Sequence, residues 1–402
     1  MASEAPVESG WPALTYESLP WRPSDVPASR TARRRHRGPY EAAVVPPIAS
    51  TSADLPSATA AVADEAAAEI ARFDAELGRE IAPFGAVLLR SESAASSKIE
   101  NLTASARAIA EAELHGHAGR NASLIVANER AMNAAIELAE RLDGDAILAM
   151  HAALLERSAP AIAGRWRDQQ VWIGGGDLGP HDAAFVPPHY SRVPAAIADL
   201  VAFVDRDDIP VLAHTALVHA QFETIHPFPD GNGRTGRALV HAHLRSKGLI
   251  RNVTVPVSAG LLTDVDGYFS ALARYREGDP TTIIEAFAAA GFRAVANGRR
   301  LVDDLHAIRQ DWQERVSARR DAAAWTLVDV ILRHPVVNAA LVAAELRIAA
   351  QNVYRSLRPL VEAGVLVEFS DRKRNQLWRS PEVLDALDRF AVRAGRRNRS
   401  SA

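Results

Sequence analysis

The most informative stretch of this chain of 402 residues is HPFPDGNGRTGR, residues 226–237. It places an imidazole, a carboxylate, a glycine-rich bend and two guanidinium groups close together. Imidazole accepts a proton near pH 7 without special tuning, so His226 is the candidate general base. The carboxylate of Asp230 suits Mg²⁺, which keeps several waters and binds one carboxylate together with phosphate oxygens. The stretch therefore predicts a site that holds the phosphates of a nucleotide while a hydroxyl attacks them.

The residues after Asp230 favour anion binding. Gly231 and Gly233 can adopt positive φ and present their N–H groups, so residues 231–233 are predicted to form an anion-binding nest. A helix is predicted over 234–247, and its N-terminus would point at the same anion. Arg234 and Arg237 lie three residues apart, on one side of its first turn, where both can reach phosphate oxygens. The alternative is a polar helix entry with a satisfied histidine, and the number of chemically consistent positions argues against it.

The same positions resemble the signature H-x-F-x-[DE]-G-N-G-R-x-x-R of the Fic family, and every defined position matches. The resemblance implies a mainly α fold, a helical bundle with a β-hairpin flap. It also implies an adenylyltransferase that moves AMP from ATP to a Tyr, Thr or Ser hydroxyl of a target protein or of itself. His226 would deprotonate that hydroxyl, Asp230 would orient Mg²⁺, and Phe228 would anchor the loop in the core. The residues that the resemblance assigns to the phosphates of ATP are Gly231, Asn232, Gly233, Arg234, Thr235, Gly236 and Arg237.

Two further points bear on the nucleotide. Tyr268 and Phe269 stand where family members carry a tyrosine pair beside the adenine, although the second ring is phenylalanine here and the pair could equally belong to the core. The related Doc toxins, which are phosphotransferases, carry a lysine where this chain has Gly233. That difference favours AMP transfer, with a Doc-like phosphotransferase as an alternative.

Residues 96–101, SSKIEN, resemble the inhibitory pattern [ST]-x-x-x-E-[GN] of the family. Ser96 and Glu100 are four residues apart, so on a helix they share one face. A buried carboxylate at Glu100 could form a bidentate pair with Arg237 and force ATP into a non-productive pose. The alternative is a helix end with a capping serine and a solvated glutamate.

Residues 164–188 resemble the flap of the family. Two short strands are predicted, over 170–173 and 184–186, around a glycine-rich turn. By resemblance this hairpin would clamp the target segment through main-chain pairing, a form of strand addition. The alternative is an ordinary surface hairpin. The residues expected to dock the target are Trp172, Ile173, Gly174, Phe185 and Val186.

Composition sets the outer limits. The net charge of −3 gives no general attraction to nucleic acid or membranes, and the absence of cysteine excludes disulfides and thiol catalysis. The start of the chain lacks the pattern of a signal peptide, and no apolar stretch is long enough for a membrane helix. We therefore expect a cytoplasmic protein without membrane contact. The sequence leaves the oligomeric state open, a homodimer included.

Four regions are expected along the chain. Residues 1–58 are rich in proline and serine and are predicted to be extended. Residues 59–142 are predicted to be helical, with an interruption around 83–85, and to carry the inhibitory motif. Residues 143–300 are expected to form the Fic catalytic domain. Residues 301–402 are expected to form a linker helix and a winged-helix-like domain.

The pattern of the last hundred residues is typical of a winged helix-turn-helix. Helices are predicted over 326–333, 339–346 and 350–363, followed by a strand over 364–369, a basic turn and a returning strand over 376–379. Pro359 is expected to kink the second helix of the motif. The candidate DNA contacts are Gln351, Asn352, Tyr354, Arg355 and Arg358, with Arg372, Lys373 and Arg374 in the wing. The alternative function is therefore a DNA-binding regulator whose Fic domain is subordinate or senses nucleotide.

Overall fold

The computed structural model describes residues 10–21, 29–78, 81–115, 119–176, 178–319, 323–369 and 376–395. Helices dominate, which confirms the predicted fold class. The chain divides into two compact units. The first unit comprises residues 1–65, 133–247 and 266–288, and the second comprises residues 66–132, 248–265 and 289–402. None of the helices in these ranges combines the length and the apolar character needed to cross a membrane.

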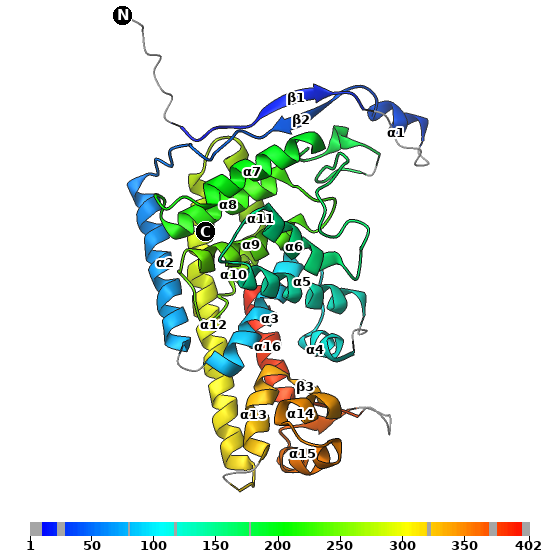
Figure 1. The fold of residues 1–402 in the computed structure, drawn as a ribbon, viewed down its shortest axis with the longest axis vertical. Coiled ribbons are helices and arrows are strands. Elements are labelled where there is room, and N and C mark those ends of the chain that lie inside the picture. Colours follow the sequence, from blue (N-terminus) through cyan, green and yellow to red (C-terminus); the bar gives the residue numbers. More distant parts are fainter. Residues whose placement is uncertain are drawn as a thin grey trace, which may run out of the picture. The chain divides into compact units, whose positions relative to one another are not determined.

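The first unit is built around helix α8 (Val211–Ile225), which packs against α7 (Val193–Val204) and α9 (Asn232–Ser246), while α6 (Gly144–Leu155) packs against α9. Figure 1 shows these helices in green and teal. Residues 212–225 of α8 are all buried. A helix buried on every side belongs at the centre of a bundle. The apolar pattern of the sequence predicts helices over 144–156, 194–204 and 211–223, and α6, α7 and α8 confirm them to within two residues.

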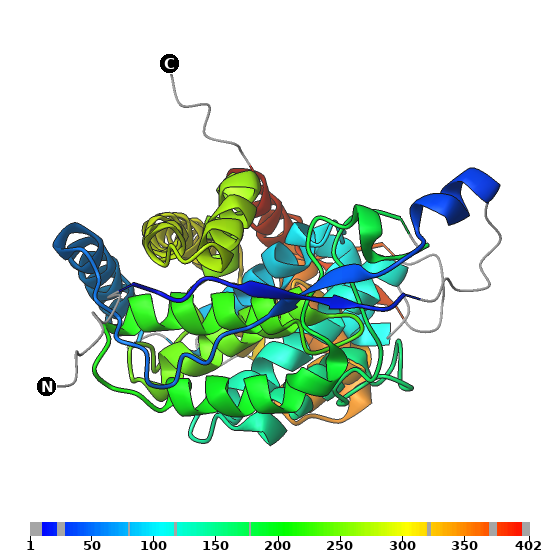
Figure 2. The same cartoon turned by 90° about the horizontal axis from the view of Figure 1, so that it is seen from above.

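The N-terminal segment of the first unit is more regular than expected. Strand β1 (Thr15–Leu19) pairs with β2 (Tyr40–Val44) in an antiparallel hairpin, and helix α1 (Arg30–Arg35) lies between them in sequence. The hairpin is drawn in dark blue in Figure 2. Tyr40 and Ala42 of β2 are buried, because they pack with Val186 of the region predicted to be the flap. The segment was predicted only to be extended, and the regular pairing of β1 with β2 depends on this distant packing.

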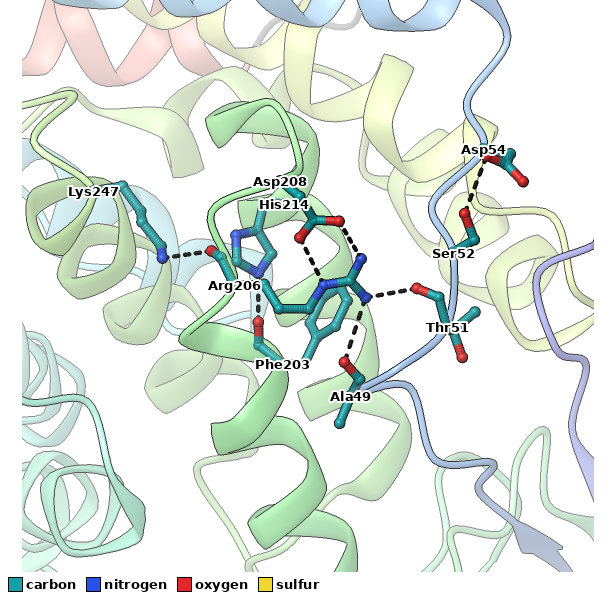
Figure 3. Close-up of polar contacts among 9 residues, drawn as sticks. All are labelled: Ala49, Thr51, Ser52, Asp54, Phe203, Arg206, Asp208, His214 and Lys247. Carbon is teal, nitrogen blue, oxygen red and sulfur yellow. Dashed lines mark hydrogen bonds and ion pairs between the residues drawn. The ribbon is translucent and has the colours of Figure 1, made fainter.

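Arg206 holds residues 49–51 against the end of α7 (Figure 3). Its Nη1 donates to the carbonyl of Thr51 at 2.6 Å, and its Nε donates to Asp208 at 2.9 Å. The guanidinium carbon also lies 5.3 Å from the centre of the Phe203 ring. The chain before α2 (Ser57–Leu77) is thus bound to the helical bundle by a partly buried cation.

The first unit also contains η1 (Pro180–Asp182), η2 (Tyr190–Arg192), α11 (Val265–Arg276) and the start of α12 (Thr281–Arg315). The short helices η1 and η2 precede α7. Helix α11 follows η3 (Leu262–Asp264) and leads to α12, whose first residues belong to this unit.

The second unit has α3 (Ile81–Ile99) at its centre, packed against α10 (Val257–Leu261), α13 (Ala323–Arg333) and α16 (Pro381–Ala394). Its other helices are α4 (Ala106–His115) and α5 (Arg120–Glu137). On α3, the carboxylate of Glu92 is fully buried and accepts the N–H of Ser258 at 2.8 Å. The helix break predicted around 83–85 was wrong. Pro83 lies in the first turn of α3, where its missing N–H removes no helical hydrogen bond.

The C-terminal region of this unit contains the predicted elements and one more strand. After α13 come β3 (Val336–Asn338), α14 (Ala339–Leu346), η4 (Ala350–Asn352), α15 (Val353–Glu362), β4 (Val367–Glu368) and β5 (Leu377–Arg379). The strands form an antiparallel sheet in the order β3-β5-β4. Helix α15 continues through Pro359 to Glu362, so the expected kink does not end it. The expected wing residues Arg372, Lys373 and Arg374 lie outside the described residues.

Candidate active site

The loop between α8 and α9 carries the sequence that predicted the site. Helix α8 ends at Ile225, and His226 adopts a left-handed conformation with φ of 50°. Asn232 closes the loop, because its Oδ1 accepts the N–H of Phe228 at 2.9 Å and its Nδ2 donates to the carbonyl of Phe228 at 2.8 Å. The side-chain oxygen and nitrogen of Asn232 thus each make a hydrogen bond within the loop, and its role toward phosphate stays a prediction.

The loop is anchored by aromatic stacking. Phe228 is fully buried, as expected, and its ring stacks on His151 of α6 with centroids 3.7 Å apart and planes 7° apart. The Nδ1 of His151 accepts the N–H of Gly164 at 3.0 Å, so its Nε2 donates to the carbonyl of Asp230, also at 3.0 Å. Burial lowers the pKa of His151, which keeps it neutral. In the sequence His151 is a lone histidine on an apolar helix, and nothing local marks it as a support of the loop.

His226 is neutral at physiological pH. Its side chain is half-buried, and the protein lowers its pKa to about 3, first by burial and then by the charges of Arg167 and Arg276. The carbonyl of Glu223 acts in the opposite direction. A neutral imidazole can accept a proton, so His226 is in the form that a general base requires.

Gly231 and Gly233 have different roles in the loop. Gly231 has φ of 81°, and a Cβ there would lie 2.9 Å from Cδ2 of Leu154. This position therefore requires glycine. Gly233 lies in the first turn of α9 with helical backbone, so the expectation of positive φ at both glycines was wrong for the second. The loop therefore has a left-handed Gly231 followed by the N-terminus of α9, an arrangement that can bind an anion.

Asp230 projects toward solvent beside this helix N-terminus. Its side chain is 66% exposed, its Oδ1 accepts the N–H of Gly231 at 2.6 Å, and Nη2 of Arg234 lies 3.7 Å away. Within the described ranges, no three histidine, aspartate or glutamate side chains gather as a self-sufficient metal site. A single exposed carboxylate fits Mg²⁺ that is shared with phosphate oxygens and water.

The first two turns of α9 bury the remaining motif residues. Arg234 and Arg237 are 5% and 2% exposed, and the pKa of His219 is lowered to about 3 first by burial and then by the charge of Arg237. Thr235 is buried. A Cβ on Gly236 would lie 2.6 Å from Oε1 of Glu223, so Gly236 faces α8 and permits close helix packing. The positions of Thr235 and Gly236 therefore do not indicate that either residue binds phosphate.

The candidate adenine residues differ in exposure. Tyr268 is 2% exposed and its hydroxyl lies 2.7 Å from Nε2 of His219, which places its ring in the core. Phe269 is 49% exposed, and its ring centre lies 5.2 Å from that of Tyr268. Of the pair, Phe269 is therefore the ring that a base could reach.

The region predicted as a flap has less regular pairing than expected. Ile173 and Phe185 form one antiparallel bridge, with the N–H of Ile173 2.8 Å from the carbonyl of Phe185. Two full strands were predicted. Only one bridge forms because the backbone turns away at Gly174, which has φ of 75°. The carbonyl of Val186 accepts the N–H of Ala43 at 3.0 Å, so strand β2 lies alongside this residue. Trp172 packs edge-on against Trp21, with ring centres 5.5 Å apart.

The expected inhibitory residues belong to the second unit. Ser96 is fully buried on α3. Glu100 follows Ile99, the last residue of this helix, and is exposed rather than buried as expected. The reason is the helix end, because Glu100 lies in a turn completed by Asn101, which has φ of 60°.

Comparison with known proteins identifies one domain. A family model described as Fic/DOC family matches residues 141–244. A probable protein adenylyltransferase of Aquifex aeolicus is 34% identical over 122 residues, which are 28% of this chain and 36% of that protein. The protein adenylyltransferase fic-1 of Caenorhabditis elegans is 32% identical over 107 residues, which are 26% of this chain and 19% of that protein. The chain thus matches only about a third and a fifth of the lengths of these relatives.

Among solved structures, a Fic family protein from Desulfovibrio desulfuricans G20 is 23% identical. It aligns with a TM-score of 0.49 over 79% of this chain and 95% of its own. The family model covers α6 to α9 and the loop that contains His226. The chain therefore carries a domain of the Fic/DOC family over residues 141–244.

Proposed function

We propose that the protein is an adenylyltransferase that transfers AMP from ATP to a hydroxyl side chain of a target protein or of itself. The observation that carries the proposal is the neutral imidazole of His226 beside the left-handed Gly231 and the N-terminus of α9. One group can accept a proton, and the other can bind an anion. The names of the matched relatives, which are protein adenylyltransferases, support the same activity.

In the proposed reaction His226 accepts the proton of the target hydroxyl. The hydroxyl oxygen then bonds to the α-phosphorus, and the bond from that phosphorus to the bridging oxygen of the β-phosphate breaks. Pyrophosphate leaves. Because the histidine is neutral before the reaction, no proton has to be removed from it first.

The charges that develop on the phosphates would meet three kinds of group. Asp230 would hold Mg²⁺, which supplies neutralising positive charge to the phosphate oxygens when bound. The N–H groups at the start of α9 would bind phosphate oxygens directly. Arg234 and Arg237 lie in the same turn and add positive charge there.

Labelled ATP distinguishes this activity from its alternative. We expect protein to acquire label from ATP labelled at the α position and not from ATP labelled at the γ position. A Doc-like phosphotransferase would give the opposite result. In His226→Ala the label should disappear, whereas His181→Ala, which changes a half-buried histidine of η1 in the same unit, should keep it. Labelling that survives in His226→Ala would contradict the assignment of the base.

We also propose that the segment 96–100 inhibits the enzyme. The motif, the buried Ser96 and the position of Glu100 at the end of α3 support this proposal. A carboxylate that pairs with Arg237 would compete with the γ-phosphate for the guanidinium. Removing the carboxylate would then let ATP bind in the productive pose.

Glu100→Gly tests the inhibition. We expect it to increase labelling from α-labelled ATP by about tenfold or more, the effect of releasing one charge-assisted pair. Glu156→Gly is the matched control, because Glu156 is likewise an exposed glutamate directly after a helix. Equal labelling by the wild type, the control and Glu100→Gly would show that the segment does not inhibit.

A second candidate function rests on the C-terminal region of the second unit. Helix α15 buries Val353, Leu357 and Leu360 and leaves Tyr354 and Arg355 exposed, which is the distribution expected of a recognition helix. We propose DNA binding as this alternative. A gel shift on random duplex DNA, repeated with Arg355→Ala, tests it. Absence of a shift at low salt would exclude it, because non-specific binding is strongest there.

A further inference from the structure

A cavity of about 130 Å³ lies in the second unit beside the C-terminal end of α3. Its walls come from α3, α4, α5, α16 and the turn that follows α3. Helix α16 packs against both α3 and α4, and Figure 1 draws it in red. Every residue of the lining belongs to the second unit, so the cavity shares no residue with the loop that contains His226.

Apolar side chains form most of the walls. The buried side chains of Ile109, Ile125, Leu387 and Phe390 line the cavity. An engineered protein cavity of about 150 Å³ with similar walls stays dry and binds one benzene molecule. The volume and the walls of this cavity therefore suit a single six-membered ring.

The wall formed by α3 carries a buried hydroxyl. Ser91 is 6% exposed and lines the cavity. Its Oγ makes no hydrogen bond within the part of the chain that the structure describes. On the same helix, the Oγ of Ser93 donates to the carbonyl of Ile125 at 3.0 Å. Because a buried polar group without a partner is unfavourable, a polar ligand atom beside Ser91 would be stabilised.

A lysine lines the cavity two turns further along α3. Lys98 is half-buried, and its Nζ lies at the C-terminal end of α16, 2.6 Å from the point that a Cβ on Gly395 would occupy. Its ammonium forms neither an ion pair nor a hydrogen bond with any described residue. Seven residues separate Ser91 from Lys98, so both lie on one face of the helix, with Cα atoms about 10 Å apart.

The other charged side chains of the lining have partners. Arg90 donates to both carboxylate oxygens of Glu113, at 2.5 and 2.8 Å. Oδ1 of Asp388 accepts the N–H of Ala106, the first residue of α4, at 3.2 Å. Among the charged side chains of this lining, Lys98 is therefore the one available to a ligand, and it favours an anion.

We propose that this cavity binds a small phenolic acid, with the ring among the apolar side chains, the carboxylate on Lys98 and the phenol on Ser91. A para-substituted ring with a short acid chain has its two polar ends separated by a length comparable to that between Ser91 and Lys98. The ammonium would donate to the carboxylate, and the two hydroxyl groups would share one hydrogen bond.

The turn next to the cavity contains the glutamate that we propose to be inhibitory. The N–H of Asn101 donates to the carbonyl of Lys98, and that of Leu102 donates to the carbonyl of Ser97, both at 3.0 Å. Leu102 also lines the cavity. A ligand that contacts Lys98 and Leu102 would hold this turn, and Glu100 with it. Binding itself is independent of AMP transfer, so it can be tested whether or not the proposed function holds.

Calorimetry on the full chain tests the site and its chemistry. The probe is 3-(4-hydroxyphenyl)propionate at millimolar concentration, and we expect saturable binding of one molecule per chain. Tyramine has the same ring but a cationic end, and should bind at least about tenfold more weakly. 3-Phenylpropionate lacks the hydroxyl and should bind about twofold to tenfold more weakly. No saturable binding of the phenolic acid, or equal binding of tyramine, would overturn the proposal.

Two variants place the ligand in this cavity. Ala94 lines the cavity and is half-buried, so the ring of Ala94→Phe should fill the space and abolish binding. Ala86→Phe is the matched control, because Ala86 is a half-buried alanine of the same helix that does not line the cavity. If both proteins bind the acid as the wild type does, the ligand is not in this cavity.

Lys98→Met keeps the test decisive if Ala94→Phe does not fold. It retains the apolar stem and removes the charge, so the preference for the phenolic acid over tyramine should fall by about tenfold or more. Lys247→Met is its control, because Lys247 belongs to the first unit and pairs with Asp207 at 2.7 Å. An unchanged preference in Lys98→Met would contradict the role of this lysine.

Hydrogen exchange tests the effect on the turn. At a concentration of the acid ten times its Kd, the amides of Asn101 and Leu102 should exchange about tenfold more slowly, because opening of the turn would require release of the ligand. The same addition to Ala94→Phe should leave both amides unchanged. Saturable binding without slower exchange at these amides would show that the ligand does not hold the turn.

Discussion

At the scale of single residues, the motif positions divide into groups that face the solvent and groups that hold the loop. Asp230 is exposed, whereas Asn232 and Phe228 are used to close and anchor the turn. His226 combines a left-handed backbone with a neutral side chain. Residue types alone predicted the chemistry of the site. They could not predict which of its polar atoms are already satisfied by main-chain groups.

The pKa of His226 leads to a prediction for the rate of AMP transfer. A pKa of about 3 keeps the imidazole neutral from pH 7 to pH 5, so this group should not reduce kcat/KM over that range. If the pKa of His226 were about 6.5, only about one-thirtieth of its imidazole would be neutral at pH 5. Arg276→Gln removes one of the charges that lower the pKa, so its acid limb should move upward relative to the wild type. If the pH profiles of kcat/KM for the wild type and Arg276→Gln superimpose, Arg276 does not lower the pKa of His226. The titration of ATP itself cannot produce a difference, because it is the same for both proteins.

Gly236 gives a prediction about stability. A Cβ at this position would lie within 3 Å of both Glu223 and Phe222, specifically 2.6 Å from Oε1 and 2.9 Å from Cδ1. We expect Gly236→Ala to lower the free energy of unfolding by about 1 to 3 kcal/mol, the usual cost of overpacking. Urea unfolding measures the change. Gly176→Ala is the control, because nothing lies within 4 Å of a Cβ there. Equal stability of the two variants would show that α8 and α9 can separate without cost.

At the scale of elements, the sequence predicted helices better than strands. Helices α6 to α9 are long and have clear apolar faces or uniform burial, so local pattern was sufficient to find them. The β1–β2 hairpin and β3 were missed, because their residues become regular only by pairing with distant segments. The hydrogen bond from Nε of Arg167 to the carbonyl of His226 was missed for the same reason, since it joins residues 59 apart in the chain.

The attachment of the hairpin leads to a prediction at this scale. Tyr40→Phe removes the hydroxyl that donates to Gln170, and we expect a loss of about 0.5 to 1.5 kcal/mol in the free energy of unfolding. Tyr16→Phe is the control on the partner strand, where the side chain is 56% exposed, and it should change stability by less than about 0.5 kcal/mol. A Tyr40→Phe variant as stable as the control would mean that the hairpin is held by packing alone.

At the scale of the whole molecule, the first unit contains several buried histidines whose pKa values are lowered. Burial lowers the pKa of His214 to about 4, that of His219 to about 3 and that of His243 well below its ordinary value. The Nε2 of His214 donates to the carbonyl of Phe203 at 2.9 Å, and the Nε2 of His219 lies 2.7 Å from the hydroxyl of Tyr268. In the unfolded chain each would titrate near pH 6.5.

These histidines make stability depend on pH. Below pH 6.5 the unfolded chain binds protons that the folded chain does not, so the free energy of unfolding falls as the pH falls. Each such histidine contributes a slope of about 1.4 kcal/mol per pH unit until its folded pKa is reached. We expect urea unfolding to show this fall between pH 6.5 and pH 5, and a smaller fall in His219→Gln. Parallel curves for the two proteins would show that His219 is not neutral in the folded state.

In the proposed function, a triphosphate lies along the loop after His226 with its α-phosphorus facing the imidazole. The most direct measurement is a crystal structure of Glu100→Gly with Mg²⁺ and a non-hydrolysable ATP analogue. We predict phosphate oxygens on the N–H groups at the start of α9, Mg²⁺ on Asp230, and space for one hydroxyl oxygen between the α-phosphorus and His226. A nucleotide whose γ-phosphorus faces His226, or one bound elsewhere with this loop empty, would contradict the account.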